Sequence, residues 1–174
     1  MTALMTPSEA SPPPVLAAER PQDRLLVEGL IARAFGPGRF AKTAERLRET
    51  NRPDLAMSLV AWDEGAAVGC VRQWPVLVGG TPALLLGPFA VEADFRKRGL
   101  GARLIRSACG VAARSGHKLI LLVGDEPFFG PLGFSVALAA KVRLPGPVDP
   151  RRVMARELAA GAADGLAGLV TIAA

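Results

Sequence analysis

Residues 84–91 read Leu84-Leu85-Leu86-Gly87-Pro88-Phe89-Ala90-Val91, and residues 96–101 read Arg96-Lys97-Arg98-Gly99-Leu100-Gly101; these two segments are the most informative part of the chain. The first segment has the composition of a β-strand interrupted by Gly-Pro. Because proline cannot donate a ladder hydrogen bond and glycine inside a strand often marks a bulge, we expect pairing with the next strand to fail there. The backbone amides of Phe89 and Val91 are then free for a partner outside the sheet.

The second segment opens the strongest helix pattern in the sequence. Leu100, Leu104, Ala108 and Val111 recur at helical spacing, which predicts an amphipathic helix over residues 99–115, closed by Gly116. Its first turn offers unpaired amides and the positive end of the helix dipole, and glycine lets a phosphate approach the backbone closely. We therefore expect an anion site on the amides of residues 98–102, with extra charge from three basic side chains, Arg96, Lys97 and Arg98.

The glycine loop has three other interpretations. For a six-residue pattern alone, a solvated basic turn is as reasonable as a ligand site. A dinucleotide-binding unit needs a third glycine and an acidic residue about twenty positions further on, and Ala102 and Arg103 follow Gly101 instead. A P-loop needs Gly-Lys followed by Ser or Thr, which the sequence lacks at this point.

The N-terminal third of the chain is expected to be helical after a tail and a short strand. Residues 1–14 have too little apolar content to pack and are expected to be a disordered tail. Residues 15–18 suit a strand, and apolar pairs at every fourth position predict a helix over 21–35. A second helix is expected over 40–50, with Ala44 and Leu47 inward and these side chains outward: Lys42, Glu45, Arg46, Arg48 and Glu49.

The middle of the chain predicts an antiparallel meander. Residues 57–62, 67–78 and 81–91 are β-rich runs separated by turn signals at 63–65 and 78–81. Residues 118–123 form a continuous apolar run, as in a strand buried on both faces, and 152–158 suit a last strand before an Ala/Gly-rich tail of uncertain form. We expect one α+β (mixed α/β) domain over residues 15–174, with a central, mostly antiparallel sheet and flanking helices.

Composition excludes several classes of protein. The chain has 174 residues, 50% of them hydrophobic, enough for one core but short for two. One histidine and two cysteines far apart in sequence exclude a His/Cys zinc site and a Ser-His-Asp triad, so we expect no metal. Without a signal peptide pattern or an apolar run long enough to cross a bilayer, a cytoplasmic protein with no membrane partner is expected.

The charge balance indicates an anionic partner. The formal net charge is +5 and the sequence pI is about 10.0. The only dense basic group has glycines rather than aromatics inside it, so it suits a small phosphorylated ligand better than a nucleic acid; its members are Arg96, Lys97, Arg98, Arg103 and Arg106. No sequence feature beyond the pI favours nucleic-acid binding.

The order of these motifs resembles the GNAT (GCN5-related N-acetyltransferase) family. The resemblance rests on residues 86–91, residues 96–101, Gly116, residues 122–125 and Phe128-Phe129 with Gly133-Phe134. The residues in these segments are similar to those of a bacterial subgroup of predicted N-acetyltransferases. It implies the GNAT acyl-CoA N-acyltransferase fold, with a bulged fourth strand and an opening between the fourth and fifth strands for the acetyl-pantetheine arm. The cosubstrate implied is acetyl-CoA, held by Phe89, Ala90, Val91, Arg96, Lys97, Arg98, Gly99, Leu100, Gly101, Ala102 and Phe129.

The resemblance also implies an acceptor, which we expect to be a primary amine of a small molecule or peptide. In the family the acceptor lies against the linker of the first two helices, here residues 35–40, where Arg39 either pairs with an acidic group or is solvated. The chain is expected to be a monomer or a homodimer.

The catalytic groups are less well defined by the sequence because the chain contains no tyrosine. The family commonly has a tyrosine as general acid at the position of Phe129, and phenylalanine has no proton to give. Asp125 and Glu126 are the carboxylates expected near the opening, as a base for the amine or as caps of the next short helix. The Phe89 amide is the expected oxyanion donor. The sequence predicts a slow acetyltransferase, and a non-catalytic acyl-CoA-binding or regulatory module is the alternative.

Overall fold

The computed structural model describes residues 11–174. The helices are α1 (Arg24–Phe35), α2 (Thr43–Arg46), α3 (Leu100–Arg114) and α4 (Glu126–Phe129). The strands are β1 (Val15–Ala18), β2 (Leu59–Asp63), β3 (Ala66–Val78), β4 (Thr81–Val91), β5 (Leu119–Val123), β6 (Val142–Arg143), β7 (Val153–Glu157) and β8 (Gly168–Ile172). The first ten residues of the tail predicted over 1–14 lie outside the described residues; at its end, the Pro14 carbonyl accepts a hydrogen bond from Arg103 Nη1 at 2.6 Å.

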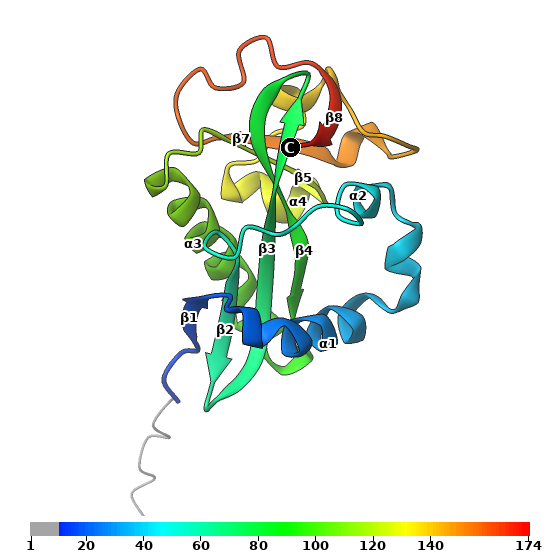
Figure 1. The fold of residues 1–174 in the computed structure, drawn as a ribbon. Helices are drawn as coiled ribbons and strands as arrows, with labels where there is room; N and C mark the ends of the chain where they lie inside the picture. Colours follow the sequence, from blue (N-terminus) through cyan, green and yellow to red (C-terminus); the bar gives the residue numbers. More distant parts are fainter. Residues whose placement is uncertain (1–10) are drawn as a thin grey trace, which may run out of the picture.

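The strands form one mostly antiparallel sheet in the order β1-β2-β3-β4-β5-β7, as drawn in Figure 1. The β4–β5 pair is parallel, and α3 provides the connection between these two strands. The long strand β3 pairs with β2 along its first half and with β8 at residues 76–78. β6 is parallel to β8. The mixed α/β fold with a mostly antiparallel sheet, predicted from the sequence, is confirmed.

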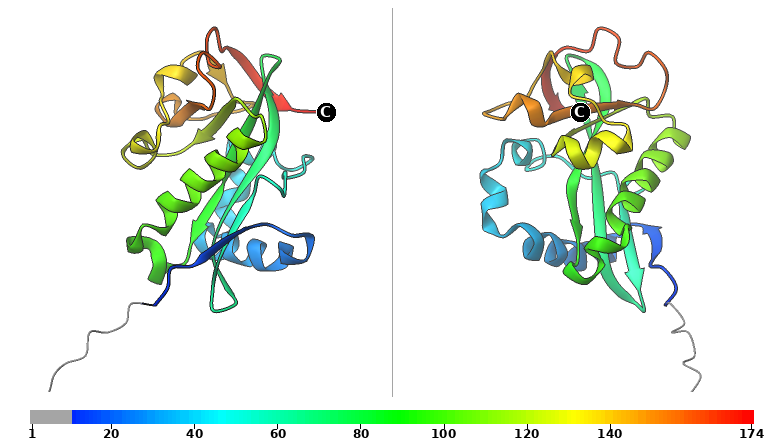
Figure 2. Two further views of the ribbon diagram at one scale, coloured as in Figure 1. Left: turned by 90° about the vertical axis from the view of Figure 1, so that its left-hand side faces the viewer. Right: turned by 180° about the vertical axis from the view of Figure 1, so that it is seen from behind.

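Two helices cover opposite faces of the sheet (Figure 2). On one face, α3 packs its apolar stripe, including Leu104 and Ala108 at 0% exposure, against Leu59 and Ala61 of β2. On the other, α1 packs Val27, Leu30 and Ile31 against Val60, which lies between those two β2 residues in sequence. This alternation is the period of two expected of a strand buried on both faces.

A buried ion network ties the first strand, α1 and the middle of the sheet together. Arg72 of β3 donates from Nε and Nη2 to both oxygens of Glu19, at 3.0 and 2.7 Å, and from Nη1 to Glu28 at 2.6 Å. Glu28 also accepts from Arg39 Nη2 at 3.0 Å. Arg72 and Glu19 are almost wholly buried, so each depends on the other to compensate its charge.

Two expectations about the elements are wrong. The helix expected over 40–50 is only one turn long, α2, preceded by a 3-10 turn at residues 37–41. Glu45, expected to point outward, is instead buried, and it forms an ion pair of 3.2 Å with Arg48, also expected outward, whose side chain is only 13% exposed. The Ala/Gly-rich C-terminus, whose form the sequence left open, forms strand β8 at the edge of the long hairpin.

Candidate functional site

The site is built around an irregularity in β4. Val71 of β3 lies opposite Phe89, and Gln73 lies opposite Leu86, so Gly87 and Pro88 together oppose a single residue, Arg72. This is the bulge expected in the fourth strand. Trp74 of β3 donates its indole N–H to the carbonyl of Gly87 at 2.5 Å and so holds the bulge in place.

Beyond the bulge, β5 no longer pairs with β4. The two strands are in register only at Leu84 and Leu85. The amide of Glu92 donates to Val68 of β3 at 2.9 Å, and alternate amides along a strand point to opposite sides. The N–H groups of Phe89 and Val91 therefore point away from β3, into the gap that β5 leaves.

The N-terminus of α3 lies beside this gap. Its N-cap residue, Gly99, has a φ of 75°, which only glycine adopts readily. The first hydrogen bond of the helix runs from the backbone amide of Arg103 to the carbonyl of Gly99, at 3.1 Å. The amides of residues 100–102 therefore have no partner inside the helix. Gly101 packs against the Phe89 ring, because a Cβ at this position would lie 2.9 Å from the Phe89 Cζ. The glycines of the loop thus have backbone and packing reasons in addition to the expected approach of a phosphate.

The basic side chains of the loop are partly engaged with the protein. Arg96 Nε donates to the carbonyl of Val91 at 3.0 Å, and the guanidinium of Arg98 lies 5.1 Å from the centre of the Phe95 ring. Lys97 is exposed. The loop surface remains cationic, and a cavity of about 320 Å³ lies against it, lined by Ala34, Phe89, Ala90, Val91, Arg96, Gly101 and Phe128.

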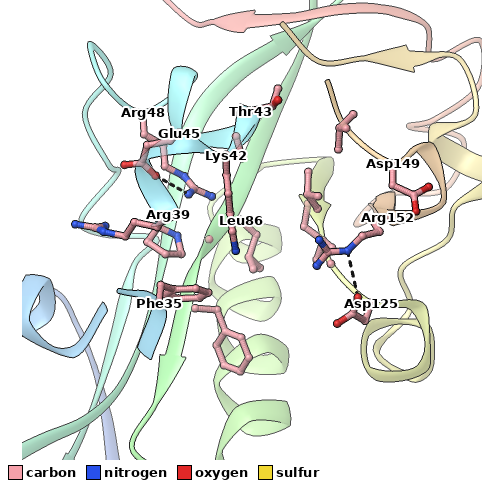
Figure 3. Close-up of a pocket in the computed structure, with 18 of the residues that line it drawn as sticks. Phe35, Arg39, Lys42, Thr43, Glu45, Arg48, Leu86, Asp125, Asp149 and Arg152 are labelled. Carbon is pink, nitrogen blue, oxygen red and sulfur yellow. Dashed lines mark hydrogen bonds and ion pairs between the residues drawn. The ribbon is translucent and has the colours of Figure 1, made fainter. Parts of the chain in front are cut away.

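A second, larger cavity of about 650 Å³ lies on the other side of the bulge. Figure 3 shows its two walls, one carrying Phe35, Arg39 and Lys42, the other Asp125 and Arg152, with β4 between them. The two walls are joined by hydrogen bonds from α2. Thr43 Oγ1 donates to the carbonyl of Pro147, and Arg46 Nη1 donates to that of Pro145 at 2.7 Å. Segments a hundred positions apart in sequence therefore enclose one space.

Two stacked phenylalanines, Phe89 and Phe128, lie between the two cavities, and two more pack behind them. Phe89 stacks on Phe128 with ring centres 5.8 Å apart, and both side chains line both cavities. Phe129 meets Phe128 edge-on at 4.8 Å and Phe134 at 5.9 Å. A Cβ at Gly124 would collide with the Phe129 ring, so the glycine after β5 is needed for this packing.

The two carboxylates expected near the opening are in different positions. Asp125 lines the larger cavity, and its side chain does not cap α4; it pairs instead with Arg152 Nε at 3.1 Å. Glu126 is exposed in the first turn of α4 and does not line that cavity. Glu45 lines the cavity too, although the periodicity over 40–50 directed this side chain outward.

The expected acceptor linker lines the same cavity, but Arg39 is already paired. Its Nη2 contacts Glu28 at 3.0 Å and its guanidinium lies 4.4 Å from the Phe40 ring centre. Two other residues, to which the sequence assigned no role in the site, belong to it. Arg48 lines the larger cavity, and Trp74 holds the Gly87 carbonyl of the bulge. No periodicity could have shown either, since the Arg48 position depends on the early end of α2 and Trp74 acts through a hydrogen bond across the sheet.

Among residues 11–174, no three His, Cys, Asp or Glu side chains form a group that could hold a metal ion. In the same part of the chain, none of the helices has both the length and the apolar character that crossing a bilayer requires. Both cysteines are free and buried, and burial raises the pKa of the Cys70 thiol to about 12.

Comparisons with known proteins agree on one family. The model of the acetyltransferase (GNAT) family matches residues 26–134. The uncharacterized N-acetyltransferase YjhQ of Escherichia coli is 30% identical over 106 residues, and the match spans 59% of this chain and 59% of the relative. The chain therefore matches less than two thirds of that relative's length.

Solved structures extend the likeness to nearly the whole chain. The GNAT family N-acetyltransferase YhbS of E. coli, in complex with CoA, has a TM-score of 0.81 at 27% identity, over 95% of this chain and 93% of that one. A GNAT family acetyltransferase of Brucella melitensis, in complex with acetyl-CoA, has a TM-score of 0.58 at 27% identity, over 81% and 94% of the two chains.

Proposed function

Because the chain belongs to the GNAT family of acetyltransferases, we propose that it transfers the acetyl group of acetyl-CoA to a primary amine by direct attack of the amine on the thioester. One observation carries the proposal: β4 and β5 part at the bulge, and the amides freed there lie beside the open N-terminus of α3. The relatives YhbS and the Brucella protein, solved with CoA and acetyl-CoA, support it.

The residues present fit the cosubstrate. The pyrophosphate would be held by the amides of residues 98–102, where the helix dipole favours an anion, and by the charges of Arg96, Lys97 and Arg98. The pantetheine arm would pair with the backbone of Phe89, Ala90 and Val91 as a strand would, since β5 leaves this edge free. Acetyl-CoA supplies an activated acyl group, so the protein itself needs no covalent intermediate.

The chemistry assigned to the protein is mainly positioning and charge stabilisation. The Phe89 N–H, fixed by the bulge, is the proposed donor to the thioester oxygen as negative charge develops on it. The amine enters through the larger cavity, the new C–N bond forms, and the C–S bond breaks with release of CoA. Holding the two reactants in register is a large contribution to rate in such reactions.

Proton transfer is the weak part of this machinery. The attacking amine must lose a proton, and Asp125, at the rim of the larger cavity, is the proposed acceptor, directly or through water. Glu126 remains a second candidate but does not line the cavity. Phe129 packs where the family commonly has a tyrosine, and it cannot protonate the leaving thiolate. We infer that water supplies this proton and that turnover is slow.

Isothermal titration with acetyl-CoA tests the binding site. The wild-type protein should bind saturably, and Gly99→Glu should abolish binding, because a carboxylate would stand where the phosphates bind. Gly116→Glu is the matched control: it introduces the same residue at a similar φ, 86° against 75°, with open space around the added Cβ at both positions, but at the other end of α3. Absence of wild-type binding, or equal binding by the two variants, would overturn the proposal.

A second candidate function, a non-catalytic acyl-CoA-binding or regulatory module, is favoured by a single observation, the phenylalanine at position 129 in a chain without tyrosine. Such a module would bind acetyl-CoA as tightly as the enzyme does. A screen of amines, amino acids, polyamines and aminoglycosides with thiol detection separates the two, because only the enzyme releases CoA faster than the uncatalysed reaction.

A further inference from the structure

Arg48 is a largely buried cation that has few partners and lines the larger cavity. Within residues 11–174 its side chain makes one hydrogen bond, from Nη1 to Glu45 at 3.2 Å, although a guanidinium has five N–H donors. Its Nε is buried and has no partner in this part of the chain. The side chain is only 13% exposed, and it lines the cavity. Nη2 has no hydrogen-bond partner in this part of the chain either, and unlike Nε it is not closed off from the cavity. Buried polar groups in proteins are normally paired, so Nη2 calls for a partner from outside the chain.

The charge of Arg48 is only partly compensated by its surroundings. Burial lowers the pKa of Arg48; the Glu45 carboxylate opposes this shift, and the nearby positive charge of Arg39 adds to it. An anion entering the cavity beside Arg48 would relieve both effects, because it would neutralise one cation and screen it from the other.

The cavity as a whole carries an excess of positive charge. Five cations line it within the described part of the chain, Arg39, Lys42, Arg46, Arg48 and Arg152, against three carboxylates, Glu45, Asp125 and Asp149. Arg39 and Arg152 have carboxylate partners of their own, Glu28 and Asp125. Lys42 rests over the Phe35 ring at 5.1 Å. In Figure 3 the side chains of Lys42 and Arg48 both point toward the middle of the cavity.

From these contacts we infer that the acceptor amine carries an anionic group, a carboxylate or a phosphonate-like oxyanion, which binds Arg48 with Lys42 beside it. This inference rests on the proposed function, since it concerns the second substrate of the same site. It replaces the expected role of Arg39, whose guanidinium is held by Glu28.

The position of Arg48 limits the length of the acceptor. Its Nη2 lies 3.0 Å from where a Cβ on Gly87 would be. Phe89, the proposed oxyanion donor, is two residues further along the same strand than Gly87. At about 3.3 Å per residue, it is no more than about 7 Å from Gly87. The anion and the reacting nitrogen should therefore be separated by a few bonds, as in amino acids and aminoalkylphosphonates, and not by a long polyamine chain.

The test compares acids with their neutral amides. L-leucine, L-phenylalanine, β-alanine and 4-aminobutyrate are assayed against the corresponding amides, with 2-aminoethylphosphonate as the phosphonate arm and ethanolamine as its neutral counterpart. We expect kcat/KM to favour at least one acid over its neutral counterpart by tenfold or more. The ratio of kcat/KM for the acid to kcat/KM for its neutral counterpart is compared between the carboxylates and the phosphonate. The larger ratio identifies the oxyanion that the site prefers.

Variants assign the preference to Arg48. Arg48→Gln should raise KM for the acid at least tenfold with little change in kcat, Arg48→Lys should retain part of the preference, and acetyl-CoA affinity should be unchanged in both. Arg151→Gln is the control, because Arg151 pairs with Asp149 at 2.9 Å but does not line the cavity.

Three results would overturn the inference, and the first two are amides used as well as acids by the wild-type protein and an acid preference that survives in Arg48→Gln. Wild-type protein that transfers acetyl groups to no acid in the panel while it accepts neutral amines would overturn it as well. In each case the proposed function stands, because the wild-type protein still transfers the acetyl group to an amine. Failure to bind acetyl-CoA at all would instead count against the proposed function.

Discussion

At the scale of single residues, the proposed site has groups suited to holding acetyl-CoA but no tyrosine to act as general acid. Phe129 packs edge-on against Phe128 and Phe134, and its ring has no proton to donate. The neighbouring carboxylate, Asp125, is 75% exposed and paired with Arg152. The rate therefore depends on how much one missing proton donor costs.

Phe129→Tyr should raise turnover and leave acetyl-CoA affinity nearly unchanged. A positioned general acid is worth about a hundred- to ten-thousand-fold in rate, and we expect a gain near the lower end, since a thiolate is already a tolerable leaving group. Steady-state kinetics with a saturating acceptor measure it. In the same assay Asp125→Asn should slow the reaction and Glu126→Gln should not. If all three variants behave as the wild type, the acid–base mechanism fails and the non-catalytic module gains support.

At the scale of elements, α3 and the bulge act as one unit, because Gly101 of the helix is in contact with the Phe89 ring of the strand. A side chain at this position would force the Phe89 ring or the start of the helix to move, because an added Cβ would lie 2.9 Å from Phe89 Cζ.

Gly101→Ala should therefore weaken acetyl-CoA binding and lower the free energy of unfolding. The added methyl group would lie 2.9 Å from Phe89 Cζ, and overpacking of this kind costs about 1–3 kcal/mol. Gly110→Ala, in the same helix, is the control: its nearest neighbour is the flexible end of Arg114 at 3.2 Å, and alanine should stabilise the helix by about 0.5–1 kcal/mol. Urea denaturation and titration measure both; equal effects of the two variants would contradict the packing argument.

The elements show what the sequence could and could not predict. β3, β4, α3 and β5 were predicted almost to the residue, because local periodicity and turn residues specify them. α2 was predicted too long: the amphipathic pattern over 40–50 is present, but Thr43 and Arg46 form hydrogen bonds with residues 145–147, a tertiary contact that no local pattern encodes. Strand β8 was missed for the same reason, since its partners lie in β3 and β6.

The candidate site divides in the same way. The bulge and the glycine loop were recognisable because Gly87-Pro88 and Gly99–Gly101 have their effect through the backbone. Glu45, Arg48 and Trp74 were not, because their positions depend on segments distant in sequence that meet only in the fold. Whether Phe89, Arg96 to Ala102 and Phe129 contact acetyl-CoA stays a prediction that titration has to test.

At the scale of the whole molecule, the Arg72 network joins the end of β1, helix α1 and the part of β3 that lies opposite the bulge. Arg72 opposes the bulge in the sheet, Glu19 follows β1, and Glu28 lies on α1 and also fixes Arg39. Loss of the central cation leaves a buried carboxylate without compensation, an effect that reaches the whole fold rather than a single contact.

Arg72→Met should lower the free energy of unfolding at pH 7 by about 3–5 kcal/mol, the usual cost of breaking a buried pair. Burial alone would raise the pKa of Glu28, but hydrogen bonds from Arg72 and Arg39 lower it below its ordinary value. A depressed carboxyl pKa stabilises the fold above the ordinary pKa and stops doing so as pH falls through the folded value. In the variant, protonation relieves the unpaired carboxylates, so its deficit should shrink below about pH 4.5.

Urea denaturation at pH 7 and at pH 4 measures both parts of this expectation. Arg33→Met is the control, because Arg33 pairs with Glu92 at the surface, with 60% of its side chain exposed, and such pairs contribute less than about 1 kcal/mol. A deficit of the same size at the two pH values would show that Arg72 stabilises through packing and not through charge.

The hydrogen bond from Trp74 to the bulge also has an optical consequence. The chain has two tryptophans and no tyrosine, so light at wavelengths that phenylalanine does not absorb excites Trp62 and Trp74 alone. Trp62 lies at the far end of β2, under Arg20, and Trp62→Phe leaves one emitting indole, whose N–H is bonded to Gly87 at 2.5 Å. The emission of that variant reports on the polarity and geometry of the bulge itself. Trp74 is therefore an intrinsic fluorescent probe at the point where the two substrates are expected to meet.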